Sequence, residues 1–458
     1  QLRFVQQQLG SVLTERFPGL EQQLLLALAE LGEAGAARFS PGPPGLPSAA
    51  PAAGSMTLPG LHAAEHRAAD EAWMTAAVMV AKSCLVWLQQ LSDRFGEDIS
   101  TLDRIPEAAL QELADSGFTV LWLIGLWKRS PASKSIKRRR GQPDAEASAY
   151  AIADYVIEPS LGGEAAFAVL RDRAARCGLR LAGDMVPNHT GLDSRWVAEH
   201  PDWFIQVDRP PFSSYSFSGP DLSADPRMEI RLEDHYWDGS DAAVVFERRD
   251  TATGERRYIY HGNDGTGLPW NDTAQLDYLR SEVRSAVIDT MVQVARSFPV
   301  IRFDAAMTLV RRHVRRLWYP PPGEAGAVAS RARHGAMSDE QFAALLNGEF
   351  WSEATARLSR EAPGTLLIAE AFWMLEGYFV RNLGMHRVYS SAFMHMLRDG
   401  DNAGFREFLA RILATDPASL ARFVNFMNNP DEESAAAQFG TGDRYFAVCT
   451  LLSTLPGL

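Results

Sequence analysis

The chain has 458 residues, of which 46% are hydrophobic, and a formal net charge of −12 at pH 7. This length suits one large barrel or about two to three smaller domains. The acidic balance argues against a nucleic-acid partner, because proteins that neutralise phosphates generally present a broad basic face. A neutral substrate is the better expectation.

Membrane and export signals are the next features to consider. No apolar run reaches the roughly 18 residues of a membrane span, and the first residues lack the apolar centre of a signal peptide. The three cysteines (Cys84, Cys177 and Cys449) lie far apart without metal-ligand spacing, which predicts free thiols, buried as small apolar residues, in a reducing compartment. We therefore expect a cytoplasmic protein with no membrane partner. Because the chain opens on Gln rather than Met, a preceding targeting segment is an alternative.

The N-terminal part has its own character. Residues 1–39 carry leucine and phenylalanine at spacings of three to four, which predicts a helical segment. Residues 40–55 are rich in proline, glycine and alanine and read as a linker. We place a boundary at residue 55 and assign 56–458 to the main domain.

From about residue 83, short apolar runs alternate with amphipathic stretches such as 106–116 and 164–176, the pattern of parallel β/α units. Seven strands are predicted, at 84–88, 119–124, 179–183, 299–304, 365–370, 387–394 and 422–427. A closed barrel needs an eighth, since open edges on the first and seventh strands would be exposed. We expect that strand to be missing from this sequence, which would make the record C-terminally truncated.

A long aromatic-rich insert separates the third and fourth predicted strands, at about 188–280. Plain β/α loops run only a few residues. The insert therefore predicts an additional domain on the face that carries the strand C-termini.

Carboxylate-bearing stretches follow three of the apolar runs. They are Asp184-Met-Val-Pro-Asn-His189, Ile301-Arg-Phe-Asp304 and Leu367-Ile-Ala-Glu370. In a parallel β/α barrel the C-terminal strand ends face one pocket, so we expect Asp184, Asp304 and Glu370 to lie together. A fourth stretch, Phe426-Met-Asn-Asn-Pro-Asp431, adds another acid.

In this order, the four stretches resemble the signature regions of the alpha-amylase family of glycoside hydrolases (family 13), which run Asp-x-x-x-Asn-His, Arg-x-Asp, a strand-end Glu and Asn-His-Asp. The resemblance covers about residues 83–458. It implies a TIM (β/α)8-type barrel with a domain B inserted after the third strand, which here is the segment at about 188–280. Gln275-Leu-Asp277 resembles the family's short fifth region, at the end of that domain.

The resemblance also implies roles for the acids. Cleavage with retention needs a nucleophilic carboxylate and an acid/base carboxyl group about 5 to 5.5 Å apart. Asp304 would be the nucleophile, with Arg302 projecting to the same side of its strand, although a purely structural Arg–Asp pair is an alternative. Glu370 would be the acid/base. Glu353 and Glu376 are rivals, but neither ends an apolar strand.

Asp431 would be the third family acid, which binds sugar hydroxyls and favours ring distortion. The family's preceding His is Pro430 here, which offers neither a ring nitrogen nor a backbone N–H. The sequence Asn-x-Pro-Asp is similar to the corresponding region of maltosyltransferases that use maltose 1-phosphate. This departure leaves the substrate open.

Four further residues follow from the resemblance. His189 would donate to a sugar hydroxyl, Asp184 would support the pocket floor, and Tyr150 would stack on the sugar unless it is a core tyrosine. Asn188 occupies the position that binds structural calcium in many amylases. One Asn is weak evidence for an ion that takes six to eight oxygens, so we expect no required cofactor and keep calcium as an alternative.

The segment 127–140 carries seven basic residues in an otherwise acidic chain. A solvated surface loop is the simpler interpretation. The alternative is a loop that attracts an anionic or phosphorylated sugar.

These features predict an α-retaining glycoside hydrolase or transglycosylase that acts on α-glucosidic bonds of oligo- or polysaccharides. A glycosyltransferase that uses a sugar 1-phosphate is one alternative. A catalytically silent glucan-binding barrel is another, although the joint presence of Arg302, Asp304, Glu370 and Asp431 speaks against it.

Overall fold

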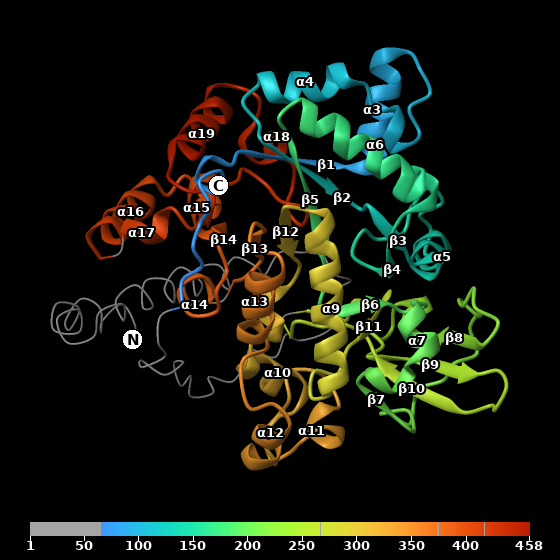
Figure 1. Cartoon of the computed structure of the whole chain (residues 1–458). Coiled ribbons are helices and arrows are strands. Elements are labelled where there is room, and N and C mark those ends of the chain that lie inside the picture. The colour runs from blue at the N-terminus through green and yellow to red at the C-terminus, as the bar shows by residue number, and fades with distance from the viewer. Residues whose placement is uncertain (1–65, 266, 373–374, 416) are drawn as a thin grey trace. The chain divides into compact units, whose positions relative to one another are not determined.

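The computed structural model describes residues 66–265, 267–372, 375–415 and 417–458. The chain divides into two compact units (Figure 1). The larger unit is Ala77–Glu370, and the described part of the smaller unit consists of residues 66–76 and those that follow Glu370. The predicted helical segment and linker at 1–55 lie outside the described residues.

The larger unit is built on a parallel sheet whose strands lie side by side in chain order. These strands are β1 (Met79–Ser83), β2 (Val120–Ile124), β5 (Arg180–Met185), β12 (Val300–Phe303) and β13 (Leu366–Ala369). Helices connect them: α3 (Cys84–Phe95), α4 (Glu107–Asp115), α6 (Gly163–Arg176), α9 (Ser281–Ser297) and α13 (Phe350–Glu361).

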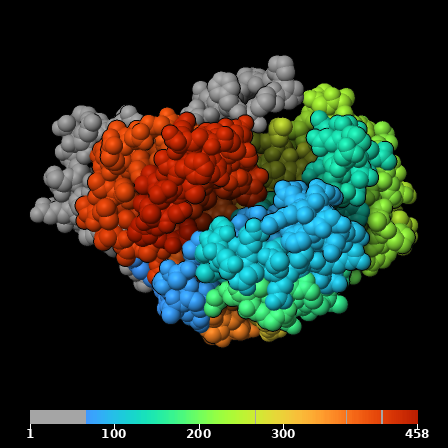
Figure 2. Space-filling model, turned by 90° about the horizontal axis from the view of Figure 1, so that it is seen from above, coloured from blue at the N-terminus to red at the C-terminus, as the bar shows by residue number. Residues whose placement is uncertain are grey.

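The strands are buried because helices cover the sheet. In β12 and β13 every residue is buried, as expected for parallel strands between a helical layer and a core. Helix α6 packs on β5, α9 packs on β5 and β12, and α13 packs on α9. In Figure 2 the segments that form α3, α4 and α6 lie side by side on the surface of this unit.

The strand prediction at 84–88 is wrong. Those residues begin helix α3, and the strand lies just before them as β1. Within the run, Cys84, Trp87 and Leu88 are buried while Leu85 and Val86 are exposed, which is helical periodicity. A five-residue apolar run cannot separate the two structures by itself.

The basic segment at 127–140 is also not a loop. It forms β3 (Trp127–Arg129) and helix α5 (Pro131–Arg139), and β3 pairs with β4 (Ile152–Ile157). Ser130 caps α5 by accepting from the Ser133 N–H, and Pro131 suits the first helical position. Figure 2 shows α5 beside the inserted domain, where Arg140 donates to the Tyr236 carbonyl at 2.8 Å.

The insert between β5 and α9 contains its own antiparallel sheet, in the order β7-β10-β9-β8. Its strands are β7 (Gln206–Val207), β8 (Met228–Leu232), β9 (Val245–Asp250) and β10 (Arg256–Tyr260), with helices α7 (Arg195–Glu199) and α8 (Asp234–Asp238). At its base, β6 (His189–Gly191) pairs with β11 (Thr273–Gln275). This pair joins the two ends of the insert, and its first strand begins at His189, the last residue of the Asp184–His189 stretch.

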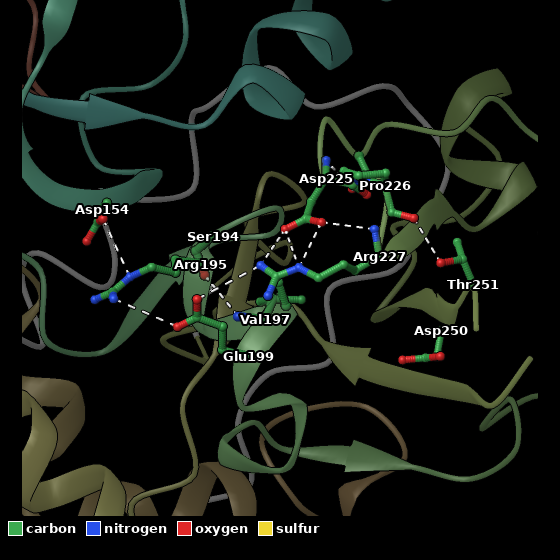
Figure 3. A network of polar contacts seen from close by, with 12 residues as sticks. Asp154, Ser194, Arg195, Val197, Glu199, Asp225, Pro226, Arg227, Asp250 and Thr251 are labelled. Atoms are coloured by element: carbon green, nitrogen blue, oxygen red, sulfur yellow. Dashed lines mark hydrogen bonds and ion pairs between the residues drawn. The ribbon is translucent and has the colours of Figure 1, made fainter. Parts of the chain in front are cut away.

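A surface network of ion pairs connects the insert to β4 (Figure 3). Arg195 lies between Asp154, at 3.5 Å, and Glu199, at 3.8 Å. Arg227 lies between Glu199, at 3.9 Å, and Asp225, at 2.7 Å. Because all five side chains are solvent-accessible, the network contributes little free energy despite its extent.

Between β12 and β13 the chain forms three short helices before α13. They are α10 (Arg311–Trp318), α11 (Arg331–His334) and α12 (Asp339–Leu345). The buried face of α10 carries His313, Val314, Leu317 and Trp318.

The smaller unit has two parallel strands, β14 (Arg387–Tyr389) and β15 (Phe423–Val424). Its helices are α14 (Glu376–Arg381), α15 (Ser391–Asp399), α16 (Asn402–Thr415), α17 (Pro417–Leu420), α18 (Ala435–Phe439) and α19 (Asp443–Thr454). Asp70 ties the segment before the larger unit to this one by pairing with Arg387 at 2.9 Å and Arg422 at 3.0 Å. The strand predicted at 387–394 is shorter than expected, since helix α15 begins at Ser391.

Within the described residues, six of the seven parallel strands of the two units overlap the predicted ranges, and β1 replaces the strand predicted at 84–88. The cysteines are free, and Cys84 and Cys177 are buried. No helix in the described ranges is long and apolar enough to cross a membrane.

Candidate active site

Three of the four predicted acids meet at one end of the larger unit's sheet. Asp184 lies on β5, Asp304 directly follows β12, and Glu370 directly follows β13. The register places Arg302 opposite Asp184 on one side and Ile368 on the other. Because these parallel neighbours end together, the structure confirms that the three carboxyl groups share one site.

Arg302 is the centre of this cluster. Its guanidinium nitrogens lie 3.3 Å from Asp184 Oδ1, 2.5 Å from Asp304 Oδ1 and 2.9 Å from Glu370 Oε1. Its side chain is only 1% exposed. A planar guanidinium can contact several carboxylates at once, and removing it would leave buried negative charge uncompensated.

Asp184 is the most deeply buried of the acids. Burial raises its pKa to about 6, against the opposing effects of Arg302 and of a hydrogen bond from Trp122. Trp122 Nε1 donates to Asp184 Oδ2 at 3.0 Å. Asp184 therefore shares the Arg302 guanidinium with Asp304 and Glu370 and helps to hold that guanidinium in place.

Glu370 is held by two nitrogen atoms. Arg302 faces Oε1, and the Ala305 N–H donates to Oε2 at 2.7 Å. Ala305 adopts a left-handed backbone, with φ at 46°, which is uncommon for a residue with a Cβ and is found at strained functional turns. That conformation turns the residue after the proposed nucleophile towards the proposed acid/base.

The rivals of Glu370 do not share this position. Glu353 is exposed on α13, and Glu376 belongs to α14 of the smaller unit. Neither follows a strand, as the sequence indicated.

Tyr150 and His189 border the cluster. The Arg302 guanidinium lies 5.2 Å from the centre of the Tyr150 ring, a cation–π distance. His189 is hydrogen-bonded to the Tyr150 backbone, and its ring lies 5.1 Å from that of Trp270. Burial lowers the pKa of His189, which favours the neutral imidazole with one N–H to donate.

Comparison with known proteins gives a family match for part of the chain. The model "Alpha amylase, catalytic domain" matches residues 91–243. A trehalose-6-phosphate hydrolase from Bacillus licheniformis is similar in structure, with a TM-score of 0.52 and 16% identity, over 84% of this chain and 64% of that one. An alpha-amylase from Lactobacillus plantarum has a TM-score of 0.47 and 17% identity, over 80% of this chain and 66% of that one. Residues 91–243 are thus similar to the alpha-amylase catalytic domain, and the chain as a whole is similar in fold to the trehalose-6-phosphate hydrolase.

The likeness to the trehalose-6-phosphate hydrolase supports the TIM (β/α)8-type fold for this chain. A curated relative, the alpha-1,4-glucan:maltose-1-phosphate maltosyltransferase of Arcanobacterium haemolyticum, is 34% identical over 120 residues. That match covers 24% of this chain and 17% of the relative. The comparisons thus include both hydrolases and a transferase.

The family's calcium position is Asn188, and its side chain is engaged elsewhere. Asn188 Oδ1 accepts from Gln275 Nε2 at 3.0 Å, and Asn188 Nδ2 donates to Gln275 Oε1 at 3.2 Å. The described residues also contain no group of three or more His, Cys, Asp or Glu side chains placed to hold a metal. Calcium at Asn188 stays a prediction, and the amide oxygen that would bind it accepts a hydrogen bond from Gln275 in this structure.

Asp431, the third family acid, belongs to the smaller unit, where it follows β15 and is exposed. Its N–H donates to Asn429 Oδ1 at 3.0 Å. This hydrogen bond closes an Asx turn that has Pro430 at its centre. The next residue, Glu432, accepts from His395 Nε2 of α15 at 3.0 Å. The role of Asp431 beside Asp304 and Glu370 stays a prediction.

Sequence reasoning missed Trp122, Ala305 and Gln275 as partners of the acids and of Asn188. The family pattern pointed only to the region of Gln275. No local sequence pattern predicts the roles of Trp122 and Ala305, because each donates a hydrogen bond to an acid that belongs to a different strand.

Proposed function

We propose that this protein is an α-retaining glycoside hydrolase or transglycosylase that acts on α-glucosidic bonds of oligo- or polysaccharides. The observation that carries the proposal is the cluster of three strand-end carboxyl groups around the buried Arg302. A barrel that only binds glucan has no use for an ionised nucleophile paired with a second carboxyl group. The match of residues 91–243 to the alpha-amylase catalytic domain supports the same chemistry.

In the first step, an oxygen of Asp304 attacks the anomeric carbon while the bond to the leaving oxygen breaks. Protonated Glu370 gives its proton to that oxygen. In the second step, ionised Glu370 takes a proton from water or a sugar hydroxyl, whose oxygen attacks the anomeric carbon and releases Asp304. The contacts of Glu370 with Arg302 and the Ala305 N–H suit this ionised form.

The other residues would bind and orient the sugar. Arg302 holds Asp304 in place, and neutral His189 would donate to a hydroxyl beside it. Tyr150 would stack on the sugar ring, and Asp431 would hold hydroxyl groups of the distorted sugar. This division of roles needs no metal or cofactor.

Maltosyl transfer from maltose 1-phosphate is the second candidate. Two observations favour it: Pro430 stands where hydrolases of the family have His, and the curated maltosyltransferase is 34% identical over the matched segment. In that reaction Asp304 would displace phosphate, and an acceptor glucan would then take the maltosyl group.

Fluoride release from α-glucosyl fluoride tests the proposal. The protein is incubated with this donor alone, with maltooligosaccharide and with phosphate, and products are identified. Asp304→Asn should abolish release, because an amide is a poor nucleophile. Asp289→Asn is the matched control, since Asp289 is 57% exposed on α9 and only pairs with Arg357.

Product identity then separates the candidates. Free glucose indicates hydrolysis, longer oligosaccharides indicate transfer, and a sugar 1-phosphate indicates the phosphate-dependent reaction. Release that persists in Asp304→Asn would contradict Asp304 as the nucleophile, and a folded wild type that never releases fluoride would favour the silent binding barrel.

A further inference from the structure

The turn between β5 and β6 has an unusual set of partners. We use the word turn for residues 184–189, which run from Asp184 near the end of β5 through Asn188 to His189 at the start of β6 and so pass from one sheet to another. Each of its five consecutive carbonyl oxygens accepts a hydrogen bond from elsewhere: Asp184 from Trp127 Nε1 (2.7 Å), Met185 from the Asp304 N–H (2.9 Å), Val186 from the Tyr155 hydroxyl (3.2 Å), Pro187 from the Tyr278 hydroxyl (2.5 Å) and Asn188 from Gln275 Nε2 (3.0 Å).

Such complete pairing is required because the turn is buried. Val186 is 2% exposed, and a buried backbone group without a partner costs about as much as a lost hydrogen bond. Strand neighbours normally supply the donors. Here four side chains from outside the turn supply donors in addition to the main-chain N–H groups of Asp304 and Leu276, so the path of the backbone depends partly on those side chains.

Tyr155 fixes the turn at two points. Its hydroxyl donates to the Val186 carbonyl and accepts from the Val186 N–H at 2.8 Å. One oxygen atom thereby sets the orientation of both peptide groups that flank Val186. Tyr155 lies on β4, and its ring packs on Trp127 with centres 5.3 Å apart.

Tyr278 holds the carbonyl of the next residue, Pro187, and lies C-terminal to the turn in sequence, whereas Tyr155 lies N-terminal to it. Tyr278 follows β11 at the far end of the insert, is 2% exposed, and packs its ring on Phe350. The two hydroxyls thus reach adjacent carbonyls from segments 31 and 91 positions away in the sequence.

We propose that Tyr155 and Tyr278 are positioning residues for the reaction. By fixing Val186 and Pro187, they keep Asp184 against Arg302 and place His189 at the sugar. Neither hydroxyl touches the carboxyl groups that react. This proposal rests on the proposed function, since it assumes that the Arg302 cluster is the catalytic centre.

Removal of one oxygen atom tests the idea. The variants are Tyr155→Phe, Tyr278→Phe and the double variant, all of which keep the packed ring. Tyr258→Phe is the matched control, because Tyr258 is also buried and donates from its hydroxyl to Glu247 Oε2 at 3.1 Å, within the sheet of the insert. The assays are kcat and KM for fluoride release and hydrogen exchange of a peptide that spans residues 184–189.

Each single variant should lower kcat by about ten- to a hundredfold, because small misplacements of reacting groups are that costly. KM should change less than about threefold, since binding is not the step affected. In Tyr155→Phe the 184–189 peptide should exchange about tenfold faster. The double variant should lose less than the product of the single effects, because both hydroxyls act on one turn.

Wild-type kcat and wild-type exchange in both single variants would overturn the inference, and so would an equal loss of kcat in Tyr258→Phe. Absence of fluoride release from the wild type would instead count against the proposed function. The exchange of the 184–189 peptide would still report whether the hydroxyls hold the turn.

Discussion

Replacing Asp184 by Asn should change how stability depends on pH. Asp184 is 3% exposed and shares Arg302 with Asp304 and Glu370. Asn is nearly the same size and cannot ionise. The variant therefore removes a single titration while leaving the packing of the site almost intact.

The magnitude follows from the pKa, which burial raises from 3.8 to about 6. Between these values the folded protein holds a proton that the unfolded chain has released, so the free energy of unfolding falls as pH rises. The interval spans about 2 pH units, and each is worth about 1.36 kcal/mol, which gives about 3 kcal/mol. The contribution is fully present below pH 4 and is lost by about pH 6 to 7.

Urea unfolding between pH 4 and pH 7, followed by tryptophan fluorescence, measures the effect. The free energy of unfolding of the wild type minus that of Asp184→Asn should fall by about 3 kcal/mol over this range. Asp225→Asn is the control, because its hydrogen bond with Arg227 lowers the pKa of Asp225. Asp225 is then ionised in both states above about pH 5, and its contribution is lost only in more acidic solution.

The reasoning would be refuted by an Asp184→Asn difference that stays constant from pH 4 to pH 7 or rises with pH. Either result would mean that contacts with Arg302 and Trp122 outweigh the burial of the carboxylate. The Asp225→Asn difference should stay constant from pH 5 to pH 7 in the same experiment.

Three further changes have defined outcomes. Arg302→Lys should lower the free energy of unfolding by about 3 to 5 kcal/mol and nearly abolish fluoride release, because an ammonium cannot reach three carboxylates at once. Since Asn188 pairs with Gln275, EDTA should leave the melting temperature unchanged to within about 2 °C, and a large fall would reveal a stabilising metal. Arg195→Ala should cost less than about 1 kcal/mol in urea unfolding, whereas a larger loss would show that the network in Figure 3 holds the insert.

Local pattern predicted the acids of the site well. Asp304 and Glu370 each follow a short apolar run, and such runs become buried strands whose ends gather at one face. Arg302 and Asp304 lie two positions apart, so an extended strand necessarily turns them to the same side. These inferences use only neighbours in sequence.

Local pattern failed where an element's identity depended on its surroundings. The run at 84–88 is apolar enough for a strand, but it forms the start of helix α3, and β1 formed from the more mixed residues before it. The basic segment at 127–140 became a capped helix because Ser130, Pro131 and the insert offered it partners. Surface charge alone gave no sign of that structure.

By itself, the sequence predicted the resemblance to the alpha-amylase family, six of the seven parallel strands and the acids that gather around Arg302, since these predictions rest on short motifs and on periodicity. Only the tertiary structure decided how the acids are held. Arg302 meets Asp184 across 118 positions, and Tyr155 and Tyr278 meet at one turn from different segments. Such contacts depend on strand register and on packing between distant elements, and a residue's near neighbours in sequence specify neither.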